Sequence, residues 1–302
     1  MPGEADLVVV NWNTAARAAT LVRSLAPVVA AGARLWVVDN GSSDGSARAL
    51  AALTPAPRVL RSEVNLGYAG ALNLALRHVD RPFLVALNTD VELDLPALRR
   101  LLATCRARAD VAAVGPALID AAGRLAVGAA GHDLTARSAA GHFLGLHRLA
   151  PRRVPSLYLP QAPLAQAGRP VRVDWVCGAA VALRRRALVR VGGVPTDSFL
   201  YAEDVLLGRR LRRSGYRVVY EPRAVVRHEG AGSQGGDPGP RWIVATLAAH
   251  EGPPVSRALA RAAASAGLAA RALLASPPAL VSPAWRDRAR RMARDARAAL
   301  LG

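Results

Sequence analysis

Short apolar runs alternate with segments of helical periodicity along the first half of the chain. Strands are predicted at 7–10, 35–38, 59–61 and 83–87, each bounded by polar or glycine-rich residues. Helices are predicted between them, where Ala, Leu and Arg recur at helical spacing, at 15–30, 44–53 and 67–79. This alternation is typical of βαβ units around a mainly parallel sheet. In such a fold, ligands bind outside the carboxyl ends of the strands.

The second half starts with a segment rich in proline and glycine at 151–170, which predicts a loop. The elements predicted after it are strands near 171–176 and 216–220 and a helix at 202–214. A glycine-rich stretch at 230–240 then predicts a flexible break. We therefore expect an α/β domain at 1–232 and a helical C-terminal tail, rich in Arg and Ala, at 233–302.

The composition limits the classes of protein to which the chain can belong. With 302 residues, 52% of them hydrophobic, the chain can bury a large core. The net charge of +18 comes from 40 basic residues that are all Arg, which a biased coding composition explains as well as binding to an anion does. Aromatic residues make up only 4%, too few for the interleaved aromatics of single-strand nucleic-acid grooves, so we expect no nucleic-acid partner.

Cysteine usage and hydropathy predict the compartment. Cys105 and Cys177 have no CxxC spacing, which predicts free thiols in a reducing compartment. Neither a signal peptide nor a membrane-spanning stretch is expected. The sequence thus predicts a cytoplasmic protein, either free or peripheral on the inner face of the cell membrane.

The last residues, 284–300, have an amphipathic pattern. Apolar residues recur at steps of four, three, four and four, at Trp285, Ala289, Met292, Ala296 and Leu300. Arginines occupy the remaining surface of the predicted helix. Such a helix lies on an anionic membrane surface or packs on the rest of the protein with a solvated basic face, and the pattern leaves both alternatives open.

Polar residues follow the first two predicted strands. Asn11 ends the first strand and Asp39 the second, and Ser43 and Asp44 stand where a helix cap is expected. A carboxylate at a strand end can accept hydrogen bonds from a base N–H or a ribose hydroxyl. Asp39 is equally compatible with a simple turn residue, because DNGSSDGS is a good turn sequence.

The third predicted strand is followed by VNLGYAGALN. Gly67 and Gly70 allow the backbone to approach a ligand closely, or serve local packing. The run is not a Walker loop, and no GxGxxG fingerprint follows any predicted strand, which argues against kinases and dehydrogenases.

Carboxylates follow the fourth strand and start the later helix. Asp90 comes after Asn88 and Thr89, where it could hold a divalent cation that bridges the oxygens of a diphosphate. Glu203 and Asp204 begin the helix at 202–214, where one of them could act as a general base or merely favour the helix start. His228 could complete a metal shell through a ring nitrogen, or be structural.

These motifs occur in a recognisable order. The ordered blocks are VVVNWNT, VVDNGSSDGS, NLGYAGALN, ALNTDVEL, VDWVCGAAVALRRRAL and FLYAEDVLLGRRLRRSGYRVVYEPRAVVRH. Over residues 6 to 233 the chain resembles the inverting glycosyltransferase family 2, most closely its rhamnosyltransferase-like bacterial branch.

The resemblance implies a GT-A fold, a nucleotide-diphosphate-sugar donor, a Mg²⁺ or Mn²⁺ ion and single displacement at the anomeric carbon. By position, Asn11, Asp39, Asn65, Gly67 and Asn88 are the nucleotide-sugar contacts that it implies. The other implied roles are metal binding by Asp90 and His228, sugar or acceptor contacts by Trp175 and Gly178, and catalysis by Asp204 as the base with Glu203 beside it.

The chain departs from the family pattern at three places. Thr89 stands where the metal motif usually has Pro or an acid, Leu206 replaces an acid after the base, and Asp197 is the only carboxylate of the preceding turn. The resemblance predicts transfer of a sugar, with rhamnose or another deoxysugar favoured, to a polysaccharide or lipid-linked glycan in cell wall assembly. A non-catalytic nucleotide-sugar-binding module of the same fold is the alternative.

Overall fold

The computed structural model describes two compact units of the chain. The described residues are 1–126, 128–150, 153–159, 168–197, 199–230, 241–274 and 283–301. The first unit comprises Met1–Ala130 and Leu159–Gly236, and the second comprises Gly131–Tyr158 and Asp237–Gly302. The second unit thus takes in residues 131–158, which the sequence places in the α/β domain. Half of the predicted loop at 151–170 and most of the break at 230–240 lie outside the described residues.

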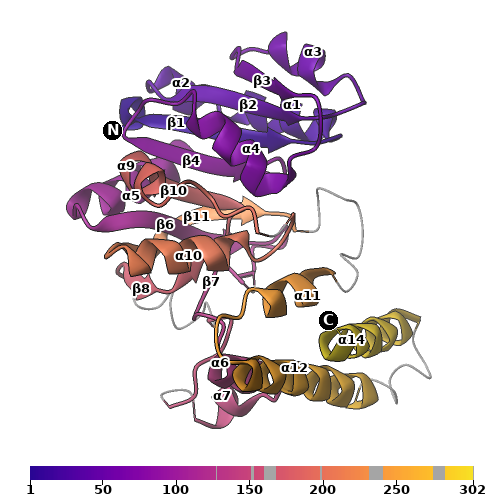
Figure 1. The fold of residues 1–302 in the computed structure, drawn as a ribbon. Helices are drawn as coiled ribbons and strands as arrows, with labels where there is room; N and C mark the ends of the chain where they lie inside the picture. The colour runs from indigo at the N-terminus through magenta and orange to yellow at the C-terminus, as the bar shows by residue number, and fades with distance from the viewer. Residues whose placement is uncertain are drawn as a thin grey trace. The chain divides into compact units, whose positions relative to one another are not determined.

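Within the described residues, nine strands of the first unit form one sheet (Figure 1). They are β1 (Ala5–Asn11), β2 (Arg34–Asn40), β3 (Arg58–Ser62), β4 (Phe83–Asn88), β5 (Val91–Glu92), β6 (Val111–Ile119), β8 (Val171–Val173), β10 (Ala180–Arg184) and β11 (Arg217–His228). The order is β3-β2-β1-β4-β10-β6-β11-β5, with β8 paired to β11. Two short strands, β7 (Ala130–Gly131) and β9 (Trp175–Val176), lie outside this sheet. The predicted mainly parallel α/β sheet is confirmed.

Helices cover both faces of this sheet (Figure 1). They are η1 (Pro2–Glu4), α1 (Ala15–Ser24), α2 (Ala26–Ala30), α3 (Ser46–Ala51), α4 (Gly67–Leu76), α5 (Leu95–Ala107), α9 (Arg185–Arg190) and α10 (Glu203–Arg213). Leu72 of α4 and Leu207 of α10 line one cavity together with Val181 of β10, so α4 and α10 lie on the same face. Figure 1 shows α5 on the opposite face.

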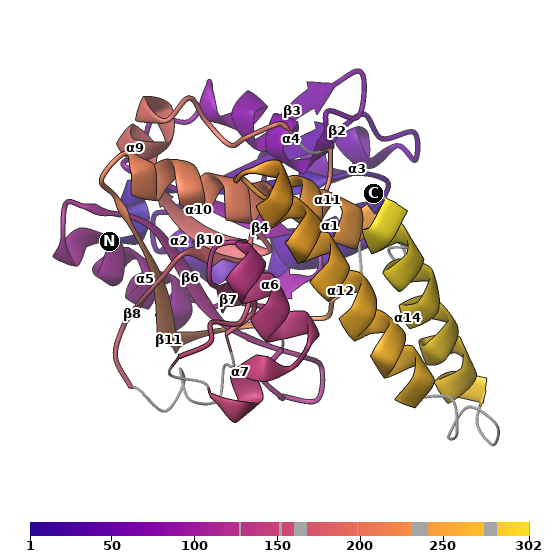
Figure 2. The ribbon, with the colours of Figure 1, turned by 60° about the horizontal axis from the view of Figure 1, so that its bottom comes forward.

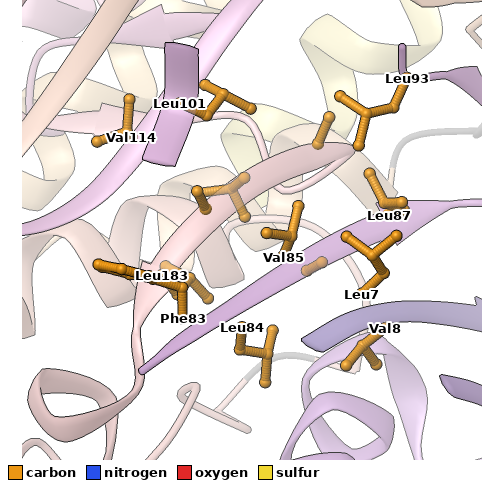
Figure 3. Close-up of a cluster of buried hydrophobic side chains, with 14 of the residues drawn as sticks. Leu7, Val8, Phe83, Leu84, Val85, Leu87, Leu93, Leu101, Val114 and Leu183 are labelled. Carbon is orange, nitrogen blue, oxygen red and sulfur yellow. The ribbon is translucent and has the colours of Figure 1, made fainter. Parts of the chain in front are cut away.

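The core lies between the sheet and these helices. Leu7 and Val8 of β1 and Leu84 and Val85 of β4 are fully buried. Figure 3 shows them in one cluster with Leu101 of α5. Strands with helices on both faces need near-continuous apolar runs, which is why these segments lack a strict polar alternation. Burying each such side chain contributes about 1.5–3 kcal/mol.

The register of the strands brings their polar ends to one rim. Asn11 pairs with Asp39 across β1 and β2, and Val10 pairs with Asn88 across β1 and β4. The neighbouring β10 runs antiparallel to β4, with Ala180 opposite Leu87, so it enters the sheet at the same rim. Residues 177–179, which precede β10, therefore lie beside the ends of the parallel strands.

Three local predictions differ from the structure. The strand expected near 216–220 continues to His228, because its distal half pairs with β6 after a bulge and then with β5. Two buried strands, β6 and β10, were not predicted. The N-cap of α3 is Gly45, while Asp44 Oδ1 accepts a hydrogen bond from the Ser46 backbone at 3.1 Å, so Ser43 and Asp44 form the turn before the helix.

The second unit is helical. Its helices are α6 (Ala136–Phe143), α7 (Leu146–Leu149), α11 (Arg241–Ala248), α12 (Pro254–Leu274) and α14 (Pro283–Leu301). Figure 2 shows α12 and α14 side by side. Gly267 of α12 packs closely against α6, because a Cβ added there would lie 2.2 Å from the Phe143 carbonyl oxygen.

The predicted C-terminal helix corresponds to α14. Ala296 and Ala299 are buried on its packed side, whereas Trp285 and Leu300 are 40% and 61% exposed. The apolar stripe therefore packs only in part. Nowhere in the described ranges does a helix combine the length and the hydropathy that crossing a bilayer requires.

Candidate active site

Asn11 and Asp39 are in contact where β1 and β2 end. Asn11 Nδ2 donates to Asp39 Oδ1 at 3.2 Å and to Ser42 Oγ at 3.2 Å. Asp39 is 1% exposed, and its Oδ2 makes no hydrogen bond with any described residue. The Nε of Arg61, on a largely exposed side chain, lies 4.0 Å from this oxygen. A buried carboxylate oxygen without a hydrogen bond lowers the stability of the folded protein, so a hydrogen-bond donor of a ligand would stabilise it.

Hydrogen bonds connect this pair to the end of β4. Thr14 Oγ1 donates to Asn11 Oδ1 at 2.9 Å and lies 3.2 Å from Thr89 Oγ1. The Asn88 backbone donates to the Ala179 carbonyl at 2.9 Å, which ties β4 to the residues before β10. Thr89, where the family pattern differs, thus joins the Asp39 region to the turn that carries Asp90.

Asn65 and Gly67 are held by the end of β2. Asn65 Oδ1 accepts hydrogen bonds from Asn40 Nδ2 and from the Gly67 backbone, both at 2.9 Å. Gly67 has a φ of +72°, and a Cβ there would lie 2.5 Å from the Phe199 carbonyl oxygen. The structure therefore places the Phe199 backbone, rather than open space, beside Gly67. The donor contacts implied for Asn65, Gly67 and Asn88 stay predictions.

Asp90 and His228 meet beside β5. The β5–β11 pairing sets His228 opposite Val91, and His228 Nε2 lies 3.5 Å from Asp90 Oδ1. Both side chains are mostly buried, at 4% exposure for Asp90 and 19% for His228. One carboxylate and one imidazole can hold a divalent cation whose remaining ligands are substrate phosphates and water. Within the described residues, no group of three or more His, Cys, Asp or Glu side chains is placed to hold a metal ion.

Glu203 and Asp204 start α10 after a strained turn. Tyr201 and Ala202 have φ values of +71° and +67°, a conformation that costs residues other than glycine about 1 kcal/mol each. Asp204 Oδ1 accepts from the Val205 backbone at 2.8 Å, and the Gly178 backbone also donates to this carboxylate. Glu203 Oε2 is buried and makes no hydrogen bond with any described residue. Strain of this kind is often found where a functional side chain is positioned.

The environment keeps both carboxyl groups from ionising readily. Burial raises the pKa of Asp204 above its usual value. Burial raises the pKa of Glu203 even further, and the neighbouring negative charge of Asp204 adds to this increase. Both carboxyl groups therefore resist ionisation in the folded state. A buried carboxylate with a raised pKa is suited to accept a proton near neutral pH.

Tyr68, Cys177 and Gly178 connect this pair to Asp90. Tyr68 of α4 donates from its hydroxyl to the Gly178 carbonyl at 2.6 Å. Burial raises the pKa of the Cys177 thiol to about 12. The carboxylates of Asp204, Glu203 and Asp90 act on this thiol in the same direction. The three carboxylates thus lie within electrostatic range of a single buried group. A cavity of about 20 Å³, the size of one water molecule, adjoins Glu203 and Asp204.

Trp175 and Gly178 differ in what surrounds them. Trp175 is 2% exposed and packs against α10 at Gly208, where an added Cβ would lie 2.9 Å from the Trp175 Cβ. Gly178 lies between Tyr68 and Asp204, as the two hydrogen bonds above show. The implied sugar or acceptor contacts of both residues stay predictions. Structurally, Trp175 packs against α10, and the Gly178 backbone contacts the Asp204 carboxylate.

Sequence reasoning missed several residues that organise the site. Thr14, Asn40 and Tyr68 each bridge two elements through hydrogen bonds. Tyr68 follows Gly67 in a segment that the sequence singles out, so its place next to a glycine was an available signal. Nothing in the local sequence marks Tyr201 and Ala202, whose left-handed conformation depends on tertiary packing.

Replacing Glu203 with Gln should change how stability depends on pH. The raised pKa means that the folded state loses stability as pH rises above about 4.5, the usual glutamate value, toward the folded-state pKa. The glutamine side chain of the variant does not titrate and removes this loss. We expect the stability of the variant relative to the wild type to increase by about 1–3 kcal/mol between pH 5 and pH 8.

Urea unfolding at both pH values measures this difference. Glu63, an exposed residue, provides the matched control as Glu63→Gln, for which the difference should be independent of pH. A Glu203→Gln difference equally independent of pH would contradict the assignment of Glu203 as a buried carboxyl that resists ionisation.

Comparison with known proteins assigns the chain to a family. The model of glycosyl transferase family 2 matches residues 6–150, and that of glycosyl transferase family 21 matches residues 157–276. The N-acetylglucosaminyl-diphospho-decaprenol L-rhamnosyltransferase of Mycobacterium tuberculosis is 31% identical over 225 residues, which cover 71% of this chain and 70% of that protein. The chain belongs to glycosyltransferase family 2.

Solved structures agree on the fold. The Pyrobaculum calidifontis mannosyltransferase PcManGT, in complex with GDP-Man and Mn²⁺, matches with a TM-score of 0.62 at 20% identity over 99% of this chain and 86% of that chain. GalNAc-T7 with UDP, GalNAc and Mn²⁺ matches with a TM-score of 0.56 at 14% identity over 81% of this chain and 47% of that chain. The transferase has the GT-A fold that the sequence predicts.

Proposed function

We propose that this glycosyltransferase inverts the anomeric centre of a sugar as it moves it from a nucleotide diphosphate to a hydroxyl group. The observation that carries the proposal is the buried Asp204 carboxylate, which has a raised pKa and lies within electrostatic range of the groups around Asp90. A general base near the metal position of the donor site is what such a transfer needs.

In this proposal Asn11 and Asp39 bind the nucleoside part of the donor. Asp39 Oδ2 is buried without a hydrogen bond from the described residues, and a base N–H or ribose hydroxyl would supply one. Asn65, in the loop between β3 and α4, and Asn88, at the end of β4, would complete the binding surface. The diphosphate then extends toward Asp90, along the Thr14–Thr89 contact.

Asp90 and His228 would hold Mg²⁺ or Mn²⁺. The Mn²⁺ in the two structural neighbours supports a divalent metal. When bound, the ion stabilises the negative charge of the leaving nucleoside diphosphate. One carboxylate and one imidazole suit this role, because the diphosphate oxygens supply the other ligands.

Asp204 would take the proton of the acceptor hydroxyl while the acceptor oxygen attacks the anomeric carbon. The nucleoside diphosphate departs from the opposite side, which inverts the centre. Hydrogen bonds from the Val205 and Gly178 backbones fix the orientation of the Asp204 carboxylate. Glu203, whose protonated form is favoured by burial, lies beside it and would contact a sugar hydroxyl.

The acceptor and the donor sugar are proposed from the rhamnosyltransferase relative. Its name specifies rhamnose and an acceptor on diphospho-decaprenol. We propose rhamnose or another deoxysugar as the transferred group and a lipid-linked glycan of cell wall assembly as the acceptor. Such an acceptor is held at a membrane, so we propose that the basic, amphipathic residues of 241–302 contact the inner face of the cell membrane.

Binding of nucleotide-diphosphate sugars tests the donor part of this proposal. A thermal-shift screen with and without Mn²⁺ should show stabilisation by one nucleotide and its sugars, because a ligand that binds the folded state raises its stability. Asp39→Asn should weaken the affinity for that nucleotide by about 10–100-fold, through loss of a charge-assisted hydrogen bond.

The control for this variant is Asp110→Asn. Asp110 is an ion-paired carboxylate that contacts Arg217, at the opposite end of β11 from His228. Its replacement should leave nucleotide affinity within about twofold of the wild type. Equal affinities for Asp39→Asn and the wild type in calorimetry would exclude Asp39 from the donor site.

A further inference from the structure

Residues of α6, α12 and α14 line a groove in the second unit. It encloses about 510 Å³. Phe143, Leu268 and Met292 form an apolar part of its lining, with Phe143 2% and Leu268 5% exposed. The groove is separate from the residues of the active site, all of which belong to the first unit.

Three arginines give the groove a positive charge. Arg271 lies on α12, and Arg288 and Arg291 lie one turn apart on α14. In the part of the chain that the structure describes, none of the three forms an ion pair with a carboxylate. Arg271 donates to the His142 carbonyl at 2.8 Å, and Arg288 lies over the Trp285 ring at 5.0 Å.

Uncompensated charge is visible at Arg271 itself. Burial lowers the pKa of this guanidinium, and the positive charge of Arg148 lowers it further. A nearby anion would favour the charged guanidinium and so oppose both effects. The one acid that lines the groove, Asp295, accepts hydrogen bonds at 3.0 and 2.9 Å from Nε and Nη2 of Arg294, so its charge is already offset.

Exposed apolar side chains lie near the ends of the same two helices. Leu273 and Leu274 end α12 with 73% and 79% exposure, and Leu300 and Leu301 end α14 with 61% and 72%. Trp285, at 40% exposure, lies near the start of α14. A site for a free phosphate ion needs only the arginines. Trp285 contacts Arg288, and Leu274 lies one turn after Arg271, so exposed apolar side chains adjoin two of the arginines. Such a combination suits a ligand that carries hydrocarbon chains.

We propose that this groove binds the headgroup of one anionic membrane phospholipid. The lipid phosphate lies among Arg271, Arg288 and Arg291. The first part of the acyl chains lies along the apolar lining, where Met292 is partly exposed. The proposal refines the membrane contact that forms part of the proposed function, but it is independent of the transfer reaction. A discrete lipid site of this kind differs from general attraction between a basic helix and an anionic surface.

Short-chain lipids below their micelle concentration test the groove without a bilayer. Calorimetry with the full chain should detect dihexanoyl phosphatidylglycerol and give at least about tenfold weaker binding for dihexanoyl phosphatidylcholine. The double variant Arg288→Gln/Arg291→Gln should weaken phosphatidylglycerol binding by at least about tenfold. Both side chains are exposed, so the variant should fold, which thermal unfolding confirms.

The matched control is Arg286→Gln/Arg290→Gln. It removes the same charge from the same helix, on a face that does not line the groove. This control should bind phosphatidylglycerol within about twofold of the wild type. Equal losses in both double variants would overturn the proposal, because they would show a general charge effect.

Two further ligands identify the chemistry of the site. Inorganic phosphate or farnesyl diphosphate binding more tightly than dihexanoyl phosphatidylglycerol would overturn the assignment to a membrane phospholipid. Asp204→Asn should bind the short-chain lipid as tightly as the wild type. A protein that binds the lipid but transfers no sugar would therefore refute the proposed reaction alone, and the reverse result would refute the groove alone.

Discussion

Replacing Asp204 with Asn should lower kcat for sugar transfer by about 10²–10⁴-fold and leave donor affinity nearly unchanged. Asn has the same shape and keeps an oxygen that can accept the backbone hydrogen bonds of Val205 and Gly178. It cannot accept the proton of the acceptor hydroxyl. Loss of a general base accounts for a reduction of this size.

Two measurements separate catalysis from folding in this variant. Nucleotide-diphosphate binding, followed by calorimetry, should equal that of the wild type, which shows that the site is assembled. The wild-type kcat should also decline on the acid side with a midpoint above 3.8, the usual Asp value, because burial raises the pKa of Asp204. Transfer by Asp204→Asn at the wild-type rate would remove Asp204 from the base role.

Replacing Asp90 with Ala should lower metal-dependent transfer by about 10³-fold. A bound divalent ion contributes several kcal/mol of charge stabilisation to the leaving group. Asp90 supplies the carboxylate oxygen that lies 3.5 Å from His228 Nε2. The concentration of Mn²⁺ needed for half-maximal activity should rise as well. Initial rates across a Mn²⁺ titration give both quantities.

Glu92 provides the matched control for Asp90. It lies two residues away, forms an ion pair with Arg227 at 3.3 Å, and is itself 67% exposed. Glu92→Gln should leave both kcat and the Mn²⁺ dependence within about twofold of the wild type. If Asp90→Ala kept the Mn²⁺ dependence of the wild type, the metal would have to bind elsewhere.

Most of the sheet could be predicted from local sequence, because buried strands of a parallel sheet have a strong apolar signal. The four strands from β1 to β4 and the polar residues at their ends follow directly from that signal. Asn11, Asp39 and Asp90 come to one rim because parallel strands end on the same side. For these residues, position along the chain was sufficient to predict position in the fold.

The other half of the site depends on contacts that sequence does not encode locally. The antiparallel β10 enters between β4 and β6, and it is this insertion that brings Gly178 next to Asp204. The partial burial of the C-terminal helix likewise depends on α12, a contact that the α14 sequence alone does not specify. Residues 131–158 join the helical unit through contacts between segments far apart in the chain.

The degree of burial of Glu203 and Asp204 also required the structure. Adjacent acidic residues at a helix start usually lie in solvent, where their negative charge interacts favourably with the helix dipole. Here the strained turn at Tyr201 and Ala202 directs the helix start into the protein, and burial then raises both pKa values. The pKa values of two adjacent acidic residues thus depend on whether the fold buries them or exposes them to solvent.

The most direct test is a crystal structure of the Asp204→Asn variant with a non-reactive metal and the nucleotide-diphosphate sugar that the thermal-shift screen identifies. We expect the nucleoside to contact Asn11 and Asp39, and the metal to lie between the diphosphate and the side chains of Asp90 and His228. The anomeric carbon should face residue 204. A donor bound in that crystal with its anomeric carbon turned away from residue 204, or with its diphosphate away from Asp90, would contradict the proposed reaction.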